Sequence, residues 1–201
     1  TLGYEAGSWF VYDPDWSGLP TSPITVPQAP ESTVGPTDTP QQHGFALGDH
    51  HLVVNDVIEQ MDCSDYAGNK LWSIPALARG QYSDYTHSIQ SSDTPPGLYV
   101  LGQVWDDRKT SGTSSTNGSY GWLTFDMVSL SEGEITTGRA GIAMHGGGTA
   151  LGYPAWWNPR QPLVPTLGCV RCYNVDLADK ILPLTKAGTV FVSVFQEYGS
   201  K

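Results

Sequence analysis

The sequence predicts a mainly β fold. Of its 201 residues, 23 are glycine and 15 are proline, and only 15% are charged. Many turn-forming residues with few charges favour short strands over helices built on glutamate and lysine. From about residue 46 onward, short apolar runs alternate with Gly, Asn, Asp or Pro. These observations predict one compact, sheet-rich domain, and the length leaves room for an appendage beside it.

Residues 1–45 are predicted to form an arm, followed by the main domain at residues 46–201. Seven prolines fall between residues 14 and 40, a density that excludes a helix and an inner strand. Several aromatic residues precede them, which is unusual for a disordered tail. We therefore expect the first residues to dock onto the main domain while the proline-rich run crosses its surface. A solvated linker is the alternative, and the arm is a candidate for contact with a protein partner.

Six apolar runs predict the strands of the main domain. In order they are "HLVVNDVIEQMD", "KLWSIPALARG", "GLYVLGQVW", "GWLTFDMVSL", "AGIAMHG" and "TVFVSVFQ". Turn-forming residues separate them, which is typical of a compact sheet. Residues 65–69, "DYAGN", predict a hairpin turn that joins the first two runs. Residues 106–121 predict an exposed loop between strands.

One segment, "NVDLADKILPL", predicts a short helix. Leu177 and Ile181 lie one turn apart on a single face, and Asn174 or Asp176 is placed to cap the first turn. Pro183 is expected to limit this helix to about two turns.

The charge balance excludes two classes of partner. Twenty acidic residues against ten basic ones give a net charge of −10, and the sequence has no run of lysines or arginines. Binding to a nucleic-acid backbone or to an anionic membrane surface is therefore disfavoured. No apolar stretch approaches the roughly 20 residues that a membrane-spanning helix needs. We expect no nucleic-acid partner and no membrane insertion.

The three cysteines admit several interpretations, because Cys169 and Cys172 stand three positions apart and Cys63 lies far away. A structural zinc site needs four nitrogen or sulfur ligands, and the sequence has no second CxxC or HxxxH, so no metal is predicted. A redox pair needs a strand–helix context of βαβ type, which is absent. A disulfide between Cys63 and Cys172 stays open and would leave Cys169 free.

The remaining interpretation makes Cys169 a nucleophile, which needs a base, a group that orients the base, and an oxyanion site. His145 ends an apolar strand where the chain turns through three glycines, so a backbone carbonyl can approach the imidazole and fix its tautomer. Gly168 permits a tight turn whose amides point at a developing oxyanion. Arg171 adds positive charge, which lowers a thiol pKa or binds a carboxylate.

The order of these motifs resembles the signature of the L,D-transpeptidase (YkuD-type) catalytic domain family. "MHGGG" is followed by "TLGCVRCYNVD", and the "TPPGLY" upstream resembles a turn of the same family. The matching positions are His145, Gly146, Thr166, Gly168, Cys169, Arg171, Asn174 and Asp176. The likeness spans roughly residues 50 to 197. Leu167 stands where many relatives carry a second histidine, so His145 has to serve as the base. Cys172 stands where relatives often carry an apolar residue, which indicates packing.

The resemblance implies a mainly β domain of sandwich-like sheets with one or two short helices and the thiol in a groove. It also implies acyl transfer between peptidoglycan stem peptides without a cofactor. Cys169 would attack a stem carbonyl and expel the terminal D-alanine, and His145 would take the thiol proton and return it to the leaving amine. Amides at Gly168 and Cys169 would hold the oxyanion. The amine of a second stem would then resolve the thioester.

The segment between the two motifs is the expected lid. Its Trp156 and Trp157 are expected either to stack on the acceptor or glycan, or to anchor the lid. The substrate-binding candidates are Gly146, Gly147, Trp156, Trp157, Thr166 and Asn174. Asn174 and Asp176 are also candidates for a helix cap and a loop brace.

The resemblance places the protein outside the cytoplasm, in the periplasm or cell wall. Two rival functions stay open. One is a hydrolase, an L,D-carboxypeptidase or endopeptidase, in which water replaces the acceptor amine. The other is a non-catalytic wall-binding module of a larger assembly such as a virus particle, with the proline-rich arm as its tether.

Overall fold

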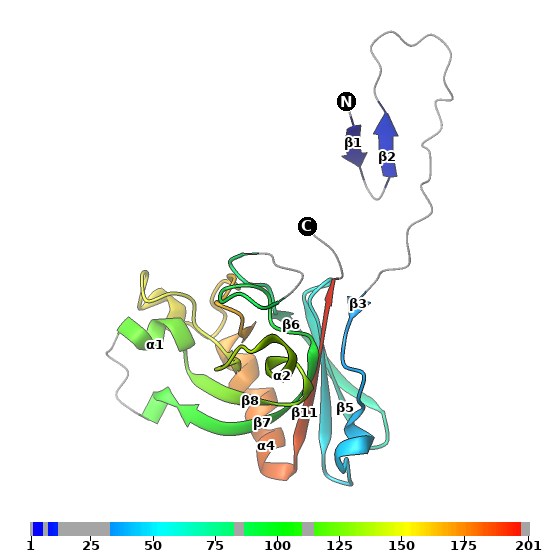
Figure 1. Cartoon of the computed structure of the whole chain (residues 1–201). Coiled ribbons are helices and arrows are strands. Elements are labelled where there is room, and N and C mark those ends of the chain that lie inside the picture. The colour runs from blue at the N-terminus through cyan, green and yellow to red at the C-terminus, as the bar shows by residue number, and fades with distance from the viewer. Residues whose placement is uncertain (1, 6–7, 12–32, 83–86, 110–114, 198–201) are drawn as a thin grey trace. The chain divides into compact units, whose positions relative to one another are not determined.

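The computed structural model describes residues 2–5, 8–11, 33–82, 87–109 and 115–197, and it divides the chain into two compact units, Thr1–Ser32 and Thr33–Lys201. In the first unit, β1 (Leu2–Glu5) pairs antiparallel with β2 (Ser8–Val11) (Figure 1). The proline-rich residues 12–32 lie outside the described residues. The docking of the arm therefore stays a prediction.

The second unit holds all the other described elements. Its strands are β3 (Thr33–Val34), β4 (His50–Asn55), β5 (Gln60–Asp65), β6 (Lys70–Leu77), β7 (Gly97–Asp106), β8 (Leu123–Glu132), β9 (Ala143–His145), β10 (Val170–Cys172) and β11 (Val190–Glu197). Its helical segments are η1 (Pro40–His43), η2 (Asp107–Lys109), α1 (Ser115–Tyr120), α2 (Glu134–Thr137), η3 (Ala155–Trp157), α3 (Asn174–Asp176), η4 (Leu177–Ile181) and α4 (Leu182–Ala187).

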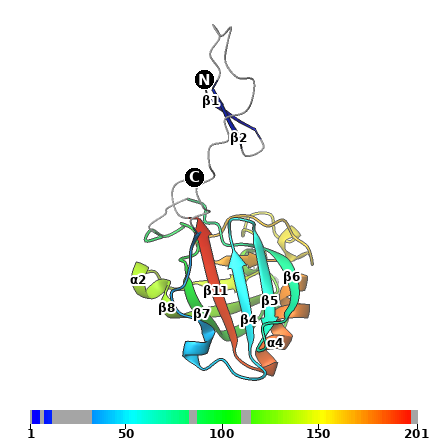
Figure 2. The same ribbon diagram turned by 90° about the vertical axis from the view of Figure 1, so that its right-hand side faces the viewer.

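The strands of this unit form one sheet that closes on itself. Their order is β3-β11-β4-β5-β6-β10-β9-β8-β7, and β11 pairs both with β4, in parallel, and with β7, antiparallel. Eight strands thus make a ring, and β3 pairs with the end of β11. Figure 2 shows β11, β4, β5 and β6 side by side. The mainly β class is confirmed, and the sandwich-like layers expected from the sequence are parts of a single barrel-like sheet.

Alternation along the strands builds the core. In β8, Leu123, Phe125 and Met127 are at most 1% exposed, whereas the residues between them are more open. The same period of two holds in β4, where Leu52 and Val54 are fully buried. Successive strand residues point to opposite faces, so these apolar side chains share the interior of the closed sheet. The interior packing fixes the register that positions the site.

The helix near the C-terminus is longer than the sequence predicts. α3, η4 and α4 follow one another without a break from Asn174 to Ala187, and Leu177 and Ile181 are fully buried as expected. Pro183 stands in the first turn of α4, directly after the π-helical turn η4. The π-helical turn already interrupts the regular i→i−4 hydrogen-bonding pattern before Pro183, so the helix continues past a residue that has no N–H. The predicted limit of two turns is therefore wrong.

Two other expectations change. The predicted loop at residues 106–121 contains η2 and α1. Residues 33–45, assigned to the arm by the sequence, belong to the second unit, because Val34 pairs with Gln196 and the Phe45 ring packs edge-on against Phe191 at 5.5 Å. The boundary between the two compact units lies at Thr33. None of the described helices has the length and apolar character needed to cross a membrane.

Candidate active site

Two neighbouring strands bring the predicted nucleophile and the predicted base together. β9 and β10 run parallel, with Arg171 opposite His145. His145 ends β9, and Cys169 directly precedes β10. Both side chains line one groove of about 370 Å³.

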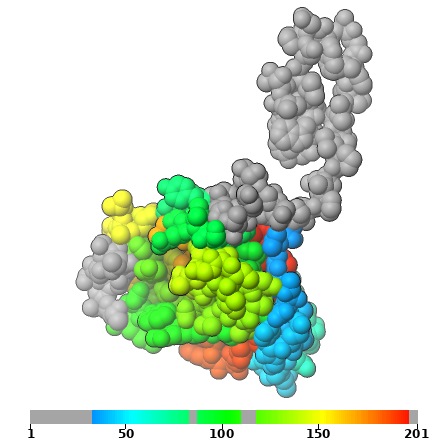
Figure 3. Space-filling model, in the orientation of Figure 1, coloured from blue at the N-terminus to red at the C-terminus, as the bar shows by residue number. Residues whose placement is uncertain are grey.

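The thiol is open to two grooves. The first is lined by Gln81, Ser119, Tyr120, His145, Gly148, Thr149, Ala150, Pro165, Thr166, Leu167, Cys169 and Arg171. The second has a volume of about 460 Å³ and shares Cys169, Tyr120 and Leu167 with the first. In the space-filling view, the surface is hollowed between the green and yellow segments, where orange atoms of the chain near residue 170 are visible (Figure 3).

The side chain of Thr166 holds the turn that carries the thiol. Its hydroxyl Oγ1 accepts a hydrogen bond from the Gly168 N–H at 2.9 Å and donates one to the Cys169 carbonyl at 2.7 Å. Gly168 adopts a φ of 113°, a backbone conformation that side chains other than hydrogen rarely allow. A Cβ at Gly168 would also collide with the guanidinium of Arg139. Both constraints explain why glycine stands before the cysteine.

One predicted role of Gly168 requires correction. Its amide was expected to face a developing oxyanion, but this N–H already donates to Thr166 Oγ1. An amide that is bonded within its own turn does not serve a substrate oxygen without losing that bond. Of the two amides expected at the oxyanion, that of Cys169 stays the candidate.

A backbone carbonyl fixes the tautomer of His145. The ring nitrogen Nδ1 lies 2.8 Å from the carbonyl oxygen of Gly146. Because a carbonyl only accepts hydrogen bonds, Nδ1 carries the proton and Nε2 keeps its lone pair. The sequence predicted a contact of this kind from the glycines that follow His145. The neutral imidazole can therefore accept a proton at Nε2.

The surroundings keep the imidazole uncharged. His145 is 4% exposed, and burial together with the positive charge of Arg171 lowers the pKa of its imidazole to about 3. The Tyr120 ring stands edge-on to the imidazole with the ring centroids 5.1 Å apart. At neutral pH the ring is available as a base and carries no charge of its own.

Arg171 braces the same carbonyl. Its Nη1 donates to the Gly146 oxygen at 2.9 Å and to the Ser119 oxygen at 3.5 Å. The side chain is 3% exposed, and burial lowers the pKa of its guanidinium to about 10, so the group is charged at neutral pH. Through these contacts Arg171 braces the backbone around Gly146 and Ser119. The guanidinium also lines the groove, and its Nε has no hydrogen-bond partner among the described atoms.

The thiol of Cys169 experiences opposing influences. Burial raises the pKa of the Cys169 thiol, whereas a hydrogen bond from the backbone of Ala143 and the charges of Arg171 and Arg139 lower it. Burial prevails, so the net pKa lies above its ordinary value. At neutral pH the resting pair is a protonated thiol beside a neutral imidazole.

The fold of this chain is similar to that of a solved structure. No family model and no curated protein matches the sequence. A point variant of the helical cell shape determining protein Pgp2 from Campylobacter jejuni is 18% identical, with a TM-score of 0.50 over 75% of this chain and 48% of that one. The chain shares its fold with Pgp2. The mainly β fold expected from the sequence resemblance is thereby confirmed.

Two further structures are similar at lower scores. Bd1075 from Bdellovibrio bacteriovorus is 18% identical over 76% of this chain and 50% of that one, with a TM-score of 0.47. L,D-transpeptidase 1 from Mycobacterium tuberculosis is 15% identical over 73% of this chain and 62% of that one, with a TM-score of 0.37. The chain spans about half the length of Pgp2 and Bd1075.

Most of the predicted substrate-binding residues do not line the groove. Thr166 lines it, whereas Gly146, Gly147, Trp156, Trp157 and Asn174 are not among its lining residues. Asn174 is fully buried, and its side-chain amide donates to the carbonyls of Trp156 and Asn158 at 3.0 and 2.7 Å. Its Oδ1 accepts the N–H groups of Gly147 and Trp122. Asn174 therefore braces the lid and does not line the groove, which corrects its predicted role in substrate binding.

The two tryptophans anchor the same segment. The indole N–H of Trp156 donates to the Leu151 carbonyl at 2.6 Å, and its ring covers Gly148 so closely that a Cβ there would overlap it. The carbonyl of Trp157 accepts the indole N–H of Trp122 at 2.7 Å. Anchoring was one of the two predicted roles, and these contacts favour it over stacking on a ligand. The lid instead presents Gly148, Thr149 and Ala150 to the groove.

Sequence reasoning missed Arg139. Its Nη1 donates to Ser92 Oγ at 2.9 Å and to the Asp93 carbonyl at 2.7 Å, and its Nη2 donates to the Leu167 carbonyl at 3.0 Å. It thus ties the segment at Ser92 and Asp93 to the turn before the thiol and brings a positive charge close to Cys169. An isolated arginine between glycines carries no local signal of this role, because its partners lie far away in the sequence.

The other cysteines are free and belong to the core. Cys63 and Cys172 are fully buried, and the structure contains no disulfide among the three cysteines. Burial raises the pKa of both thiols, that of Cys63 to about 12. In the described part of the chain, no group of three or more His, Cys, Asp or Glu side chains is arranged to hold a metal ion. The disulfide that the sequence left open is not formed here.

Proposed function

We propose that this protein is a cysteine-dependent L,D-transpeptidase that acts on peptidoglycan stem peptides through a thioester. The observation that carries the proposal is the pairing in one groove of a partly exposed thiol, on a turn held by Thr166, with an imidazole whose Nε2 is unprotonated. Nucleophile, base and orienting carbonyl are the parts that acyl transfer needs.

The proposed reaction begins with proton transfer from the Cys169 thiol to Nε2 of His145. The sulfur forms a bond to the carbonyl carbon of an L-configured stem residue, and the bond to the terminal D-alanine breaks. The proton held by His145 passes to the departing amine, which leaves a thioester on Cys169. The amine of a second stem then attacks the thioester, loses its proton and releases the thiol.

The charges around the thiol favour the thiolate that these steps create, whereas the charge of Arg171 opposes the imidazolium. Proton transfer creates an imidazolium and a thiolate, and attack creates an oxyanion. Arg171 and Arg139 place positive charge near the thiolate, and the Cys169 amide is the candidate oxyanion donor. A donor at this position typically contributes about 3 kcal/mol to stabilisation of the transition state.

The two grooves favour transfer between two stems. Cys169 lies at both, so an acyl donor in one leaves the other open to an acceptor. Water in place of the acceptor would make the protein a carboxypeptidase or endopeptidase. With peptidoglycan stem peptides as its substrates, the protein would act in the periplasm or cell wall, or on a virus particle that meets the wall.

Product analysis tests the proposal. The wild-type protein, Cys169→Ala and the control Cys172→Ala would each be incubated with purified disaccharide-tetrapeptides, and the products identified by mass spectrometry. We expect D-alanine release and cross-linked dimers from the wild type and from Cys172→Ala, and neither from Cys169→Ala. D-alanine release without dimers would identify the hydrolase. Equal D-alanine release by the wild type and Cys169→Ala would exclude Cys169 as the nucleophile, and release by neither protein would favour the non-catalytic wall-binding module.

A further inference from the structure

The second groove at the thiol has one strongly charged side chain in its lining. Among the described residues that line it, Arg139 is the only arginine, lysine, aspartate or glutamate. The chain as a whole has a net charge of −10, so much of its surface repels anions. A single arginine close to Cys169 therefore makes this groove suitable for an anionic group of a substrate.

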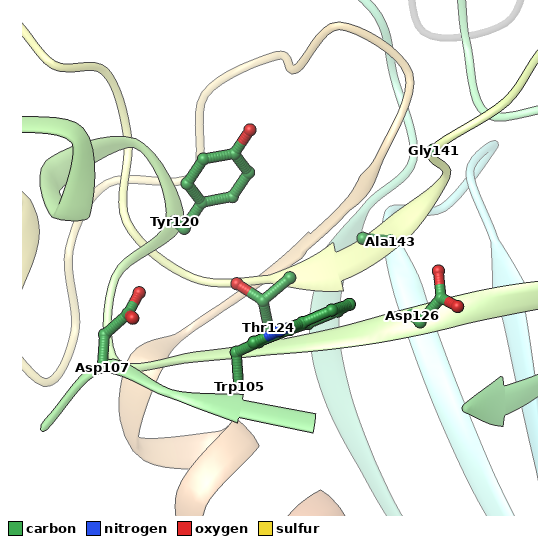
Figure 4. Close-up of a pocket in the computed structure, with 7 residues that line it drawn as sticks. All are labelled: Trp105, Asp107, Tyr120, Thr124, Asp126, Gly141 and Ala143. Atoms are coloured by element: carbon green, nitrogen blue, oxygen red, sulfur yellow. The ribbon is translucent and has the colours of Figure 1, made fainter. Parts of the chain in front are cut away.

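The neighbouring pocket has the opposite charge. It has a volume of about 350 Å³ and meets the second groove at Tyr120 and Gly141. Its described lining includes the carboxylates of Asp107 and Asp126 and no basic side chain (Figure 4). A substrate carboxylate is repelled from this side. The charges around the thiol therefore direct such a group toward Arg139.

The hydrogen bonds of Arg139 leave part of its guanidinium available. Nη1 donates to Ser92 Oγ at 2.9 Å and to the Asp93 carbonyl at 2.7 Å, with a longer contact of 3.5 Å to the His87 carbonyl. Nη2 donates to the Leu167 carbonyl at 3.0 Å. No acceptor among the described residues binds the Nε–H or the second N–H of Nη2. These two nitrogens form one edge of the guanidinium, and such an edge binds both oxygens of a carboxylate.

The guanidinium lies next to the turn that carries the thiol. A Cβ at Gly168 would collide with Nη2 of Arg139, and Gly168 directly precedes Cys169. The charge of Arg139 is among the influences that lower the pKa of the Cys169 thiol. In the proposed reaction, the carboxylate of the terminal D-alanine is one residue from the carbon that the sulfur attacks, and one residue spans about 3.8 Å. Arg139 is placed at the distance from the thiol that this carboxylate requires.

The other cation near the thiol is less accessible. Arg171 is 3% exposed, and its Nη1 donates to the carbonyls of Gly146 and Ser119. Its Nε has no partner among the described atoms, but only a deeply buried group could reach that nitrogen. The carboxylate-binding role that the sequence offered to Arg171 therefore fits Arg139 better.

We propose that Arg139 binds the carboxylate of the residue that leaves the donor stem, through Nε and Nη2, and thereby selects stems that end in a free carboxylate. This inference rests on the proposed function, because it assigns the leaving residue of that reaction. A thiolate and then an oxyanion form about one residue away from this carboxylate, and like charges at that distance repel. Pairing with Arg139 reduces the repulsion, so the same arginine recognises the leaving residue and lowers the cost of the charges that follow.

Two matched substrates test this role. The wild type, Arg139→Gln and Arg139→Lys would each be given a disaccharide-tetrapeptide ending in D-alanine and the same molecule ending in D-alaninamide, and release would be followed by mass spectrometry. We expect kcat/KM of the wild type to favour the free carboxylate about 30-fold, and that of Arg139→Gln less than about threefold. Arg139→Lys keeps the charge but loses the two-donor edge, so it should retain a preference of about tenfold.

The comparison is insensitive to damage to the fold, because both substrates meet the same protein and any inactive fraction cancels in the ratio. Arg108→Gln is the matched control. Arg108 is paired with Asp106 at 2.8 Å and is not among the lining residues of either groove. Its replacement removes one positive charge and should leave the preference at about 30-fold.

Two results would overturn the inference. Equal slowing of both substrates in Arg139→Gln would show that the arginine only holds the turn. A preference that is unchanged in Arg139→Gln would place the carboxylate elsewhere.

A binding measurement separates this inference from the proposed function. The tetrapeptide and its C-terminal amide would be titrated by NMR into Cys169→Ala, which lacks the thiol. About tenfold tighter binding of the free acid, lost when Arg139→Gln is added, would support the carboxylate site even if the wild type releases no D-alanine. Release of D-alanine and D-alaninamide at equal rates by the wild type would keep the proposed reaction and overturn the role of Arg139.

Discussion

The two faces of β9 and β10 differ in chemistry although both are largely buried. On the core face, Val170, Cys172 and Met144 are fully buried among apolar side chains. On the groove face, His145 and Arg171 are at most 4% exposed, yet they share the Gly146 carbonyl and line the groove beside Cys169. The same few residues thus supply packing on one side and reactive groups on the other.

This difference resolves the pair of cysteines in "CVRC". Side chains three positions apart along an extended chain point to opposite faces. Cys169 therefore faces the groove and Cys172 the core, and a single metal ion cannot be held between the two. A CxxC spacing indicates a metal site when it occurs in the turn of a zinc knuckle. In extended chain the same spacing puts the two cysteines on opposite faces, where they have separate roles.

The largest expected effect concerns the reactivity of the two thiols. Iodoacetamide should alkylate Cys169 in the folded protein at least about 10³ times faster than Cys172, because a buried thiol reacts only when the structure opens, at a cost of about 5–15 kcal/mol for global unfolding. Peptide mapping after short labelling measures both rates, and denatured protein is the control. Comparable rates in the folded state would contradict the assignment of the two faces.

The next prediction uses the buried imidazole. The unfolded chain takes up a proton at His145 near pH 6.5, whereas the folded protein does so only near pH 3. Stability from this group is complete above pH 6.5 and is lost as the pH falls toward 3, on the order of 3 kcal/mol between pH 6.5 and 4. Urea unfolding of wild type and His145→Gln should show a smaller loss in the variant. Met144→Leu, on the core face, should keep the wild-type dependence. Parallel curves for wild type and His145→Gln would refute the effect.

A third prediction separates strain from collision at the turn. Gly168→Ala should destabilise the protein by about 3 kcal/mol, because the residue needs a positive φ and its Cβ would meet Arg139. Gly138 also has a positive φ, of 69°, but faces open space, so Gly138→Ala should lose only about 1 kcal/mol. Urea midpoints give both values. Equal losses would mean that Arg139 moves aside freely.

The smallest effect is expected from the core face. Cys172→Ala removes one buried sulfur atom and should lower the free energy of unfolding by about 1 kcal/mol without changing D-alanine release. Denaturation and product assays on the same preparation measure the two quantities. A loss of activity at full stability would assign Cys172 a part in the chemistry and would remove the contrast between the faces.

The sequence predicted the parts of the site that depend on short segments. The glycines after His145 predicted the carbonyl beside its imidazole, and Gly168 predicted the tight turn before Cys169. Both follow from backbone geometry within a few residues. Most strand positions were predicted because apolar alternation is also local. The first predicted run, however, contains parts of two strands, β4 and β5, and β10 lies in none of the six runs.

Contacts between distant segments could not be predicted in this way. Arg139 reaches Ser92 and Leu167 only because the sheet brings them together. The closure of the sheet depends on the pairing of β11 with β7. The sequence of an apolar run does not indicate which other strand it pairs with. The amide of Gly168 was expected to be free because the hydroxyl of Thr166 had not been placed beside it.

The double pairing of β11 has a consequence for how the chain acquires its structure. β11 follows every other strand in sequence, yet it lies between β4 and β7 and completes the ring. Until residues 190–197 have joined, β4 and β7 present open edges that invite pairing with other chains. Contacts of such long sequence separation form slowly. The chain is therefore most prone to aggregation after β7 has been synthesised and before β11 has paired with it. In this interval it depends most on factors that cover the open strand edges.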